Sequence, residues 1–409
     1  MNSKQMELNK VEVWDGNTCN AQAFRQAAVD VVAAYPITPS TNTVENYAAL
    51  HSNGYVDGEI IMVESEHAAM SGCVGAGAAG GRVATATSSQ GCALMVEVLY
   101  QCSGMRIPAV LCLVNRALAA PLNVNGDHSD MYLTRDCGWI QLDSFNAQEA
   151  YDLTLCAFRI GEHKEVRLPV ISNQDGFLTS HTAQTVRPLS DKVAYDFVGD
   201  YVQVNAMLDF TKPVTHGVQT EHDWHFEHKA KQHAALMGSL PVVEEVFAEF
   251  EKVSGRKYNI VETYKVDDAD VVIVCLGTTY ETAMIAVDAI REETGIKAGV
   301  IAPRLFRPFP LTQLASKLQN VKAIACMDRS APGGTVGTLY NEVAGALFNT
   351  PARPVLKNLV YGLGGRDIIV NELKDIFVSL NEEAKNGKLN GKIQTLHGVR
   401  GPELSFYEH

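Results

Sequence analysis

The stretch Glu64-Ser-Glu-His-Ala-Ala-Met-Ser-Gly-Cys-Val-Gly-Ala-Gly-Ala-Ala-Gly-Gly81, ESEHAAMSGCVGAGAAGG, decides the fold. An apolar run at 59–63 precedes it and another at 82–87 follows it. This order is typical of a strand, a helix over 66–79 and a second strand, as in a parallel sheet whose connections are helices. The sequence around this stretch therefore predicts an α/β protein.

The end of the stretch matches G-x-G-x-x-G at Gly75, Gly77 and Gly80. A dinucleotide-binding fingerprint follows its strand at once and opens a helix, so that the pyrophosphate meets free amide N–H groups. Here the glycines close the predicted helix instead. A nicotinamide-dependent dehydrogenase is therefore disfavoured, although NAD(H) binding by the isolated chain would revive it.

The acidic residues Glu64 and Glu66 stand where the predicted helix begins. One interpretation is only that the helix dipole favours negative charge there. The other is chemical: a helix built from Ala, Ser, Gly, Cys and Val lets a flat ligand approach closely, and a sheltered carboxyl group could share a proton with a ring nitrogen.

Composition limits the possible functions. The 409 residues, 46% of them hydrophobic, are enough for two cores, and the net charge of −13 disfavours nucleic acid as a partner. The N-terminal stretch lacks the pattern of a secretory leader, and no apolar run reaches the ~18 residues of a membrane span. We expect a cytoplasmic protein without a membrane span.

The nine cysteines are scattered singly and form no C-x-x-C pair. This pattern indicates reduced, buried thiols, and it lacks the spacing with which one chain binds a ferredoxin-type iron–sulfur cluster.

Two domains are predicted, over residues 1–256 and 257–409. In the first, strands are expected at 27–35, 59–63, 82–87, 109–115 and 168–172, with helices at 43–52, 66–79, 94–103 and 147–161. Residues 183–256 are interpreted as a long excursion of this domain with a helix at 240–250. In the second, strands are expected at 270–277, 298–301 and 322–327, with a helix at 280–294.

Two loops that follow predicted strands carry further candidate site residues. In YPITPS (35–40) two prolines flank Thr38 and make the loop rigid, at the end of the strand where open α/β sheets bind ligands. In NRALAAP (115–121), Arg116 is placed to bind a carboxylate through two hydrogen bonds. The YPITPS loop could also be an ordinary strand exit, and Arg116 could also be an arginine in a solvated loop without a particular role.

A family resemblance rests on many motifs in one order. They are YPITPS, ESEHAA, TSSQG with LMVEVLY, NRALAAP, GDHSD, DCGWIQ, NAQEAYD and DGFLTSH, followed by RLFRPFP at 304–310, MDRS at 327–330 and GLGGRD at 362–367. Over nearly its whole length the chain resembles the α subunit of pyruvate:ferredoxin oxidoreductases, the thiamine-diphosphate-dependent 2-oxoacid oxidoreductases.

The resemblance implies a thiamine-diphosphate-binding fold of the pyrimidine type, mostly a parallel sheet covered by helices, followed by a smaller α/β domain like the C-terminal domain of transketolase. In that family the diphosphate and its Mg²⁺ are bound by a separate β subunit. This chain lacks the G-D-G…N magnesium pattern and is expected to supply half of an active site and no metal ligand.

The resemblance also assigns roles to residues. Glu66 matches the glutamate that hydrogen-bonds the pyrimidine N1′, where a carboxylic acid favours the tautomer that activates the cofactor. Pro36, Ser89 and Gln90 are implied as further cofactor-binding residues, and Thr38 and Arg116 as catalytic and substrate-binding residues. A threonine at position 38 points to pyruvate, with 2-oxoisovalerate as the alternative substrate.

The implied reaction is oxidative decarboxylation of pyruvate to acetyl-CoA and CO₂, with coenzyme A as co-substrate. Electrons would leave through [4Fe-4S] clusters on partner chains to ferredoxin or flavodoxin. Subunits of the β, γ and δ types are the expected partners. A scaffold that keeps the fold without catalysing the reaction is the remaining alternative.

Two motifs stay unassigned. His222, His225 and His228 suggest a metal site, but their charged neighbours look solvated and nothing is expected to fix them on a rigid element. Residues 362–366 fit either an anion-binding nest or a turn that packs against a neighbouring subunit.

Overall fold

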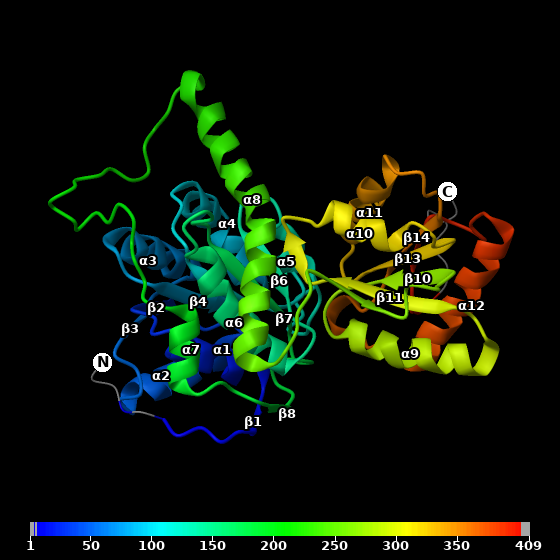
Figure 1. The fold of residues 1–409 in the computed structure, drawn as a ribbon, viewed down its shortest axis with the longest axis horizontal. Helices are drawn as coiled ribbons and strands as arrows, with labels where there is room; N and C mark the ends of the chain where they lie inside the picture. Colours follow the sequence, from blue (N-terminus) through cyan, green and yellow to red (C-terminus); the bar gives the residue numbers. More distant parts are fainter. Residues whose placement is uncertain (1–3, 5, 402–409) are drawn as a thin grey trace.

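The computed structural model describes residue 4 and residues 6–401, and the ends of the two predicted domains, residues 1–3, 5 and 402–409, lie outside this part. Within it the chain forms two α/β units that lie side by side (Figure 1). Their mostly parallel sheets confirm the expected fold class.

The first unit is built around a seven-stranded sheet in the order β12-β6-β7-β5-β4-β2-β3, parallel except for β12. Its elements in chain order are β1 (Glu12–Trp14), α1 (Gly16–Gln26), β2 (Val31–Ala34), α2 (Thr41–Ser52), β3 (Glu59–Met62), α3 (Glu66–Ala79), β4 (Val83–Thr87), α4 (Ser89–Gly104), β5 (Val110–Asn115), α5 (Ser129–Leu133), β6 (Ile140–Asp143), α6 (Ala147–Gly161), β7 (Val170–Asp175), β8 (Gln184–Val186), α7 (Asp191–Val198) and α8 (His222–Ser254).

The second unit holds a six-stranded sheet in the order β15-β14-β13-β10-β11-β9, parallel except for β9. Its elements are β9 (Val261–Tyr264), β10 (Val271–Val274), α9 (Thr279–Thr294), β11 (Ala298–Pro303), β12 (Leu305–Arg307), α10 (Leu311–Leu318), β13 (Ala323–Asp328), α11 (Thr338–Phe348), β14 (Val355–Val360), α12 (Val370–Asn386) and β15 (Gln394–Leu396), with a 3-10 turn at Leu363–Gly365.

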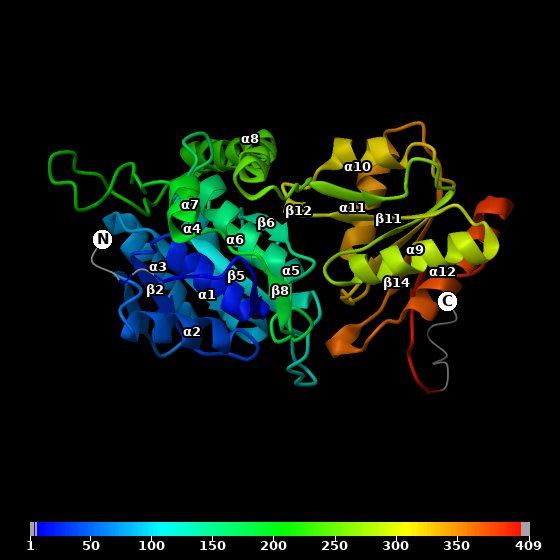
Figure 2. The ribbon, with the colours of Figure 1, turned by 60° about the horizontal axis from the view of Figure 1, so that its bottom comes forward.

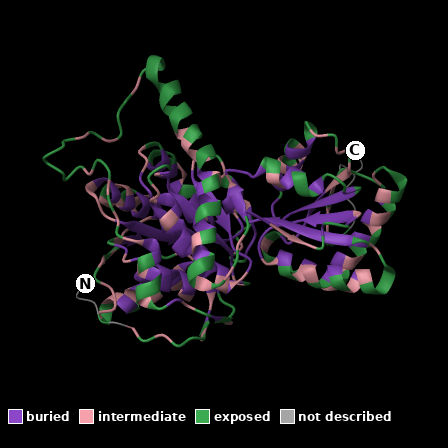
Figure 3. Cartoon of the chain, viewed as in Figure 1, coloured by how far each residue is buried: buried purple, intermediate pink, exposed green. Residues whose placement is uncertain are grey.

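Helices cover both faces of each sheet. In the first unit α1, α2 and α6 pack together, while α3 and α4 pack together on the other side. In the second unit α9 and α12 form one layer and α10 and α11 the other (Figures 1 and 2). Because both faces are covered, the central strands are buried along their whole length, which Figure 3 shows as purple sheets between helices that are banded purple, pink and green.

The helix in the deciding stretch has the predicted bounds, 66–79. The side chain of Ser65 caps it by accepting a hydrogen bond from the amide of Ala68 at 3.1 Å, and Gly80 ends it with φ +122°. The glycines therefore close a helix, with β4 following, and the structure has no helix start at the position that a dinucleotide fingerprint requires.

Several predicted bounds need correction. The strand expected from residue 27 begins only at Val31, and the helix expected from residue 94 begins five residues earlier, at Ser89. Strands β6 and β12 were not expected. β12 comes from the RLFRPFP segment of the second domain, yet it pairs with β6 and so adds an edge strand to the first sheet.

The excursion at 183–256 contains much more helix than expected. Helix α8 spans 33 residues, from His222 to Ser254, whereas a helix was predicted only at 240–250. Its second half packs on the first unit, while its first half and the loop before it project from the body (Figures 1 and 3). His222, His225 and His228 are thus on a helix, but they are exposed.

No group of three or more histidine, cysteine, aspartate or glutamate side chains among the described residues could hold a metal ion. No helix in this part of the chain combines the length and apolar character that crossing a membrane requires.

Buried charges join the two units. Asp175, at the end of β7, accepts hydrogen bonds from Thr278 and pairs with His128 at 2.7 Å and with Arg329 at 2.9 Å. Burial by itself would raise the pKa of Asp175, but Arg329 and His128 hold it well below its ordinary range. The Asp175 carboxylate is therefore ionised and ties the second unit to the sheet of the first.

Replacing Arg329 by methionine should lower the free energy of unfolding by about 3–5 kcal/mol, because it leaves a buried carboxylate without its strongest partner. Urea denaturation followed by tryptophan fluorescence measures this. The control is Lys322→Met, which breaks the more exposed Lys322–Asp270 pair and should cost at most about 1 kcal/mol. Equal effects of the two substitutions would contradict the interface described here.

A second prediction concerns pH. Burial raises the pKa of Asp143 to about 7, above the unfolded value of about 4, so its contribution to stability is complete at low pH and is lost as pH rises through 7. One oxygen accepts from the Gly277 amide at 2.7 Å and the other has no partner, so asparagine fits. Thermal melts should show the wild type losing stability between about pH 4 and 7 relative to Asp143→Asn, with little further change above pH 7; parallel profiles would rule this out.

Candidate functional site

The predicted site residues lie at one edge of the first sheet. Strands β5, β4, β2 and β3 are neighbours and run parallel, so their carboxyl ends meet at the same edge. The segments that leave these ends carry, in strand order, Arg116, Ser89 with Gln90, Thr38 with Pro36, and Glu66. Ligands of open α/β sheets bind at such an edge.

Glu66 is the first residue of α3 and is only 7% exposed. Its side chain reaches toward the start of α4, where a Cβ added to Gly91 would lie 2.6 Å from Glu66 Oε1. Among the described residues none hydrogen-bonds to this carboxylate. A mostly buried carboxylate without a partner in the described residues is available to a ligand, and its place at the ligand-binding edge favours the chemical interpretation over the helix-dipole one.

Further polar groups near Glu66 are also unpaired. Thr87 Oγ1 would lie 2.6 Å from the same added Cβ on Gly91, and it is buried without a hydrogen-bond partner. Ser88 Oγ and Gln90 Nε2 are likewise buried without a hydrogen-bond partner. The glycine at position 91 lets the side chains of Glu66 and Thr87 pack against the start of α4, and the orphan donors and acceptors beside them fit a flat polar heterocycle such as an aminopyrimidine.

Asp130, which the sequence reasoning gave no role, links the two halves of this edge. Its carboxylate accepts hydrogen bonds from the amides of Ser89 at 2.8 Å, Arg116 at 2.9 Å and Met131 at 2.8 Å, and from Asn115 Nδ2 at 3.1 Å. Burial raises the pKa of Asp130 to about 7, while the N–H donors of Ser89, Arg116 and Asn115 act in the opposite direction. One buried side chain thus fixes both the start of α4 and the backbone of Arg116.

The guanidinium of Arg116 is held by backbone oxygens. Nη1 donates to Thr38 O at 2.8 Å and Nε donates to Asn123 O at 3.0 Å. Burial lowers the pKa of Arg116, and the neighbouring Asp130 raises it, but the group remains a cation at neutral pH. Arginine has five N–H donors, so the Nη2 side stays available for a carboxylate.

The remaining predicted residues fall at the same edge. Pro36 and Thr38 are exposed in the loop after β2, and Ser89 is buried at the first turn of α4, with Gln90 half-buried beside it. The structure joins Thr38, Arg116 and Ser89 through the bonds just described, and it places Glu66 against Gly91 two residues after Ser89. All six predicted site residues therefore lie at the same edge of the seven-stranded sheet.

Sequence reasoning missed the residues that organise this edge: Asp130, Asn115, Asn123 and Gly91. A signal existed for Asp130, because GDHSD places an acid beside the apolar residues Met131 and Tyr132, in what proves to be the first turn of α5. None existed for Asn123, whose backbone oxygen is the part that contacts Arg116.

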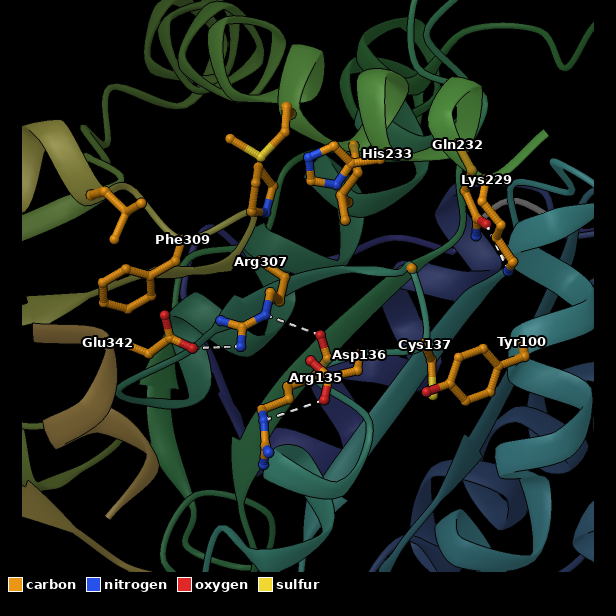
Figure 4. A pocket seen from close by; sticks show the side chains of 15 residues that line it. Tyr100, Arg135, Asp136, Cys137, Lys229, Gln232, His233, Arg307, Phe309 and Glu342 are labelled. Atoms are coloured by element: carbon orange, nitrogen blue, oxygen red, sulfur yellow. Dashed lines mark hydrogen bonds and ion pairs between the residues drawn. The ribbon is translucent and has the colours of Figure 1, made fainter. Parts of the chain in front are cut away.

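A separate cavity of about 420 Å³ lies between α4, α8 and the segment after β12 (Figure 4). Most of its charged side chains have partners: Arg307 pairs with Glu342 at 2.6 Å, Arg135 pairs with Asp136 at 3.5 Å, and Lys229 donates to Gln232 Oε1 at 3.1 Å. Burial raises the pKa of the Cys137 thiol, which also lines the cavity, to about 12. This cavity therefore offers no reactive group comparable to Glu66.

Large apolar side chains are exposed around the edge that holds Glu66. They are Tyr35, Met62, Leu94 and Leu122, and they belong to the segments that carry the predicted site residues. Exposed apolar surface beside a buried carboxylate suits a site that is completed by another surface.

Comparisons with known proteins identify the family of this chain. Residues 22–248 match the family described as pyruvate flavodoxin/ferredoxin oxidoreductase, thiamine-diphosphate-binding, and residues 269–373 match pyruvate:ferredoxin oxidoreductase core domain II. The pyruvate synthase subunit PorA of Thermotoga maritima is 46% identical over 93% of this chain and 96% of its own. The ketoisovalerate oxidoreductase subunit VorA of Pyrococcus horikoshii is 39% identical over 96% and 99%.

Solved structures agree in fold. A 2-oxoglutarate:ferredoxin oxidoreductase from Magnetococcus marinus superposes with a TM-score of 0.69 at 20% identity, covering 93% of this chain and 66% of its own. A split-gene transketolase gives a TM-score of 0.53 at 13% identity, covering 90% and 97%. Family matches over both units and full-length relatives at this identity lead to one conclusion: the chain belongs to the pyruvate flavodoxin/ferredoxin oxidoreductase family of thiamine-diphosphate-binding enzymes.

Proposed function

We propose that this chain is the α subunit of a pyruvate:ferredoxin oxidoreductase and that Glu66 hydrogen-bonds the aminopyrimidine ring of thiamine diphosphate. The observation that carries the proposal is the sheltered Glu66 carboxylate, which has no partner among the described residues and faces the start of α4. The relatives named pyruvate synthase subunits support the same reaction.

Thiamine diphosphate, when bound, supplies the nucleophilic carbon that attacks a 2-oxoacid and accepts the electrons left by decarboxylation. The residues of this chain prepare that chemistry. Glu66 holds a proton at the ring nitrogen. Gln90 Nε2 and Ser88 Oγ, which have no hydrogen-bond partner in the described residues, would hydrogen-bond the polar edge of the ring. Ser89, fixed by Asp130, and Pro36, in its rigid loop, bound the site on either side.

Arg116 and Thr38 are proposed to bind the substrate. The Arg116 guanidinium is fixed by two backbone oxygens and keeps Nη2 for the carboxylate that all 2-oxoacids share. Thr38 is exposed at the same edge, where a small hydroxyl leaves room for the methyl group of pyruvate. Orienting the substrate in this way lowers the entropic barrier to reaction.

We further propose that the site is completed by a β-type subunit that binds the diphosphate and Mg²⁺. The exposed apolar side chains around Glu66 support this. All nine cysteines are buried and separate, which supports placing the [4Fe-4S] clusters on partner chains of the β, γ or δ type. Ferredoxin or flavodoxin would accept the electrons and coenzyme A the acyl group, and the reduced thiols suit the cytoplasm.

The second candidate substrate is 2-oxoisovalerate. Relatives named ketoisovalerate oxidoreductase subunits are 38–39% identical to this chain, the same range as the pyruvate synthase subunits of Pyrococcus. Ratios of kcat/KM for the two oxoacids, measured on the purified complex, decide between them.

Glu66→Gln should reduce kcat about 10²–10⁴-fold, because glutamine keeps the size of the side chain but cannot supply a proton. The assay is coenzyme-A-dependent reduction of a viologen dye by pyruvate, with the complete complex. Glu64→Gln, at an exposed position two residues earlier, is the matched control and should keep wild-type activity. Full activity of the Glu66 variant would instead support a non-catalytic scaffold.

Arg116→Lys should raise KM for pyruvate about 10–100-fold, since an ammonium group cannot donate to two backbone oxygens and to a carboxylate in one plane. KM for coenzyme A should stay within about twofold, because that co-substrate acts after decarboxylation. Steady-state kinetics with each substrate varied in turn provides both values. An unchanged KM for pyruvate would remove Arg116 from the substrate site.

A further inference from the structure

The GLGG turn of the second unit, residues 362–365, lies against the first unit of the same chain. Gly362, Gly364 and Gly365 all have left-handed φ angles, of 66°, 59° and 80°. A Cβ added to Gly364 would lie 2.3 Å from Asn123 Nδ2, and one added to Gly365 would lie 2.4 Å from the Cβ of Asn125. Only glycine satisfies both the backbone conformation and this close approach.

Two hydrogen bonds cross between the turn and the loop that follows Arg116. Asn123 Nδ2 donates to Gly364 O at 3.0 Å, and the Gly364 amide donates to Asp127 Oδ2 at 3.1 Å. The second oxygen of Asp127 accepts from Ser129, so the acid is fixed in place. The backbone amide that could have bound an external anion thus binds a carboxylate of the other unit.

The same loop holds the guanidinium of Arg116. Asn123 contacts Gly364 through its side chain and Arg116 Nε through its backbone oxygen. Its side-chain oxygen also accepts from the Asn125 amide at 2.7 Å, which closes the loop on itself. The orientation of the Arg116 guanidinium therefore depends on the position of Asn123 O. The hydrogen bond from Asn123 Nδ2 to Gly364 O of the second unit in turn holds Asn123 in place.

We propose that the GLGG turn and Asn123 are positioning elements for substrate binding: the second unit sets the orientation of Arg116 toward the oxoacid carboxylate through Gly364 and Asn123. This inference rests on the proposed function of Arg116. It gives the second unit, which contributes none of the predicted site residues, a defined role in recognising the substrate.

The test is Gly364→Ala in the complete complex. The added methyl group displaces Asn123, so KM for pyruvate should rise about tenfold, while kcat and KM for coenzyme A change less than about threefold. Asn123→Ala, which removes the bond to Gly364 without the strain, should raise KM for pyruvate in the same direction.

The matched control is Gly295→Ala. Gly295 ends α9 in the same unit with φ 72°, and an added Cβ there meets no atom within 4 Å. It carries the backbone cost of a left-handed alanine without the contact, so thermal stability should fall as in Gly364→Ala while KM for pyruvate stays unchanged. Equal KM values for pyruvate in Gly364→Ala and Gly295→Ala overturn the proposal.

The Arg116→Lys variant distinguishes a failure of the positioning role from a failure of the proposed function of Arg116. If it raises KM for pyruvate and both Gly364→Ala and Asn123→Ala leave KM at the wild-type value, the positioning role is wrong and the proposed function stands. If Arg116→Lys also leaves KM for pyruvate unchanged, the assignment of Arg116 to the substrate site fails.

Discussion

The candidate site depends on one buried carboxylate accepting four N–H groups from three segments. Asp130 binds the amide that begins α4, the amide of Arg116 and the side chain of Asn115 at the end of β5. Ser89 has a left-handed φ of 50°, which is unfavourable for serine, and its bond to Asp130 offsets this cost. Without that side chain the start of α4 and the loop of Arg116 would share no hydrogen-bond partner, and their relative positions at the sheet edge would not be fixed.

Much of this architecture could be predicted because local physics determines it. The bounds of α3 and α6 follow from their caps and small or apolar residues, and the central strands from continuous apolar runs buried on both faces. The placement of Thr38, Glu66, Ser89 and Arg116 at one edge follows from a general property of parallel sheets, because all carboxyl ends point the same way. The family resemblance then supplied the roles that geometry alone leaves open.

What could not be predicted depends on contacts far apart in the chain. β12 is three residues long, and only its pairing with β6, more than 150 positions earlier, makes it a strand. The first half of α8 has no apolar stripe, because it projects from the body, so periodicity gave no signal for it. Asp130 and Asn123 are organised by backbone amides and carbonyls, which every residue possesses, and so their partners leave no trace in the sequence.

The small residues of α3 serve two physical purposes that the sequence could not separate. Gly77 faces inward, where an added Cβ would lie 2.5 Å from Ile107, so glycine there lets the helix approach its neighbours closely. Gly75 faces open space, with no atom within 4 Å of an added Cβ, and Ser71, one turn earlier, is also exposed. The inward glycine is explained by packing within this chain, but the outward small residues are not. A helix face without bulky side chains, beside Glu66 and the exposed Met62, allows the backbone of another chain to come close. The same helix thus carries the Glu66 carboxylate at its start and presents a face of small residues that fits the close approach of a second chain.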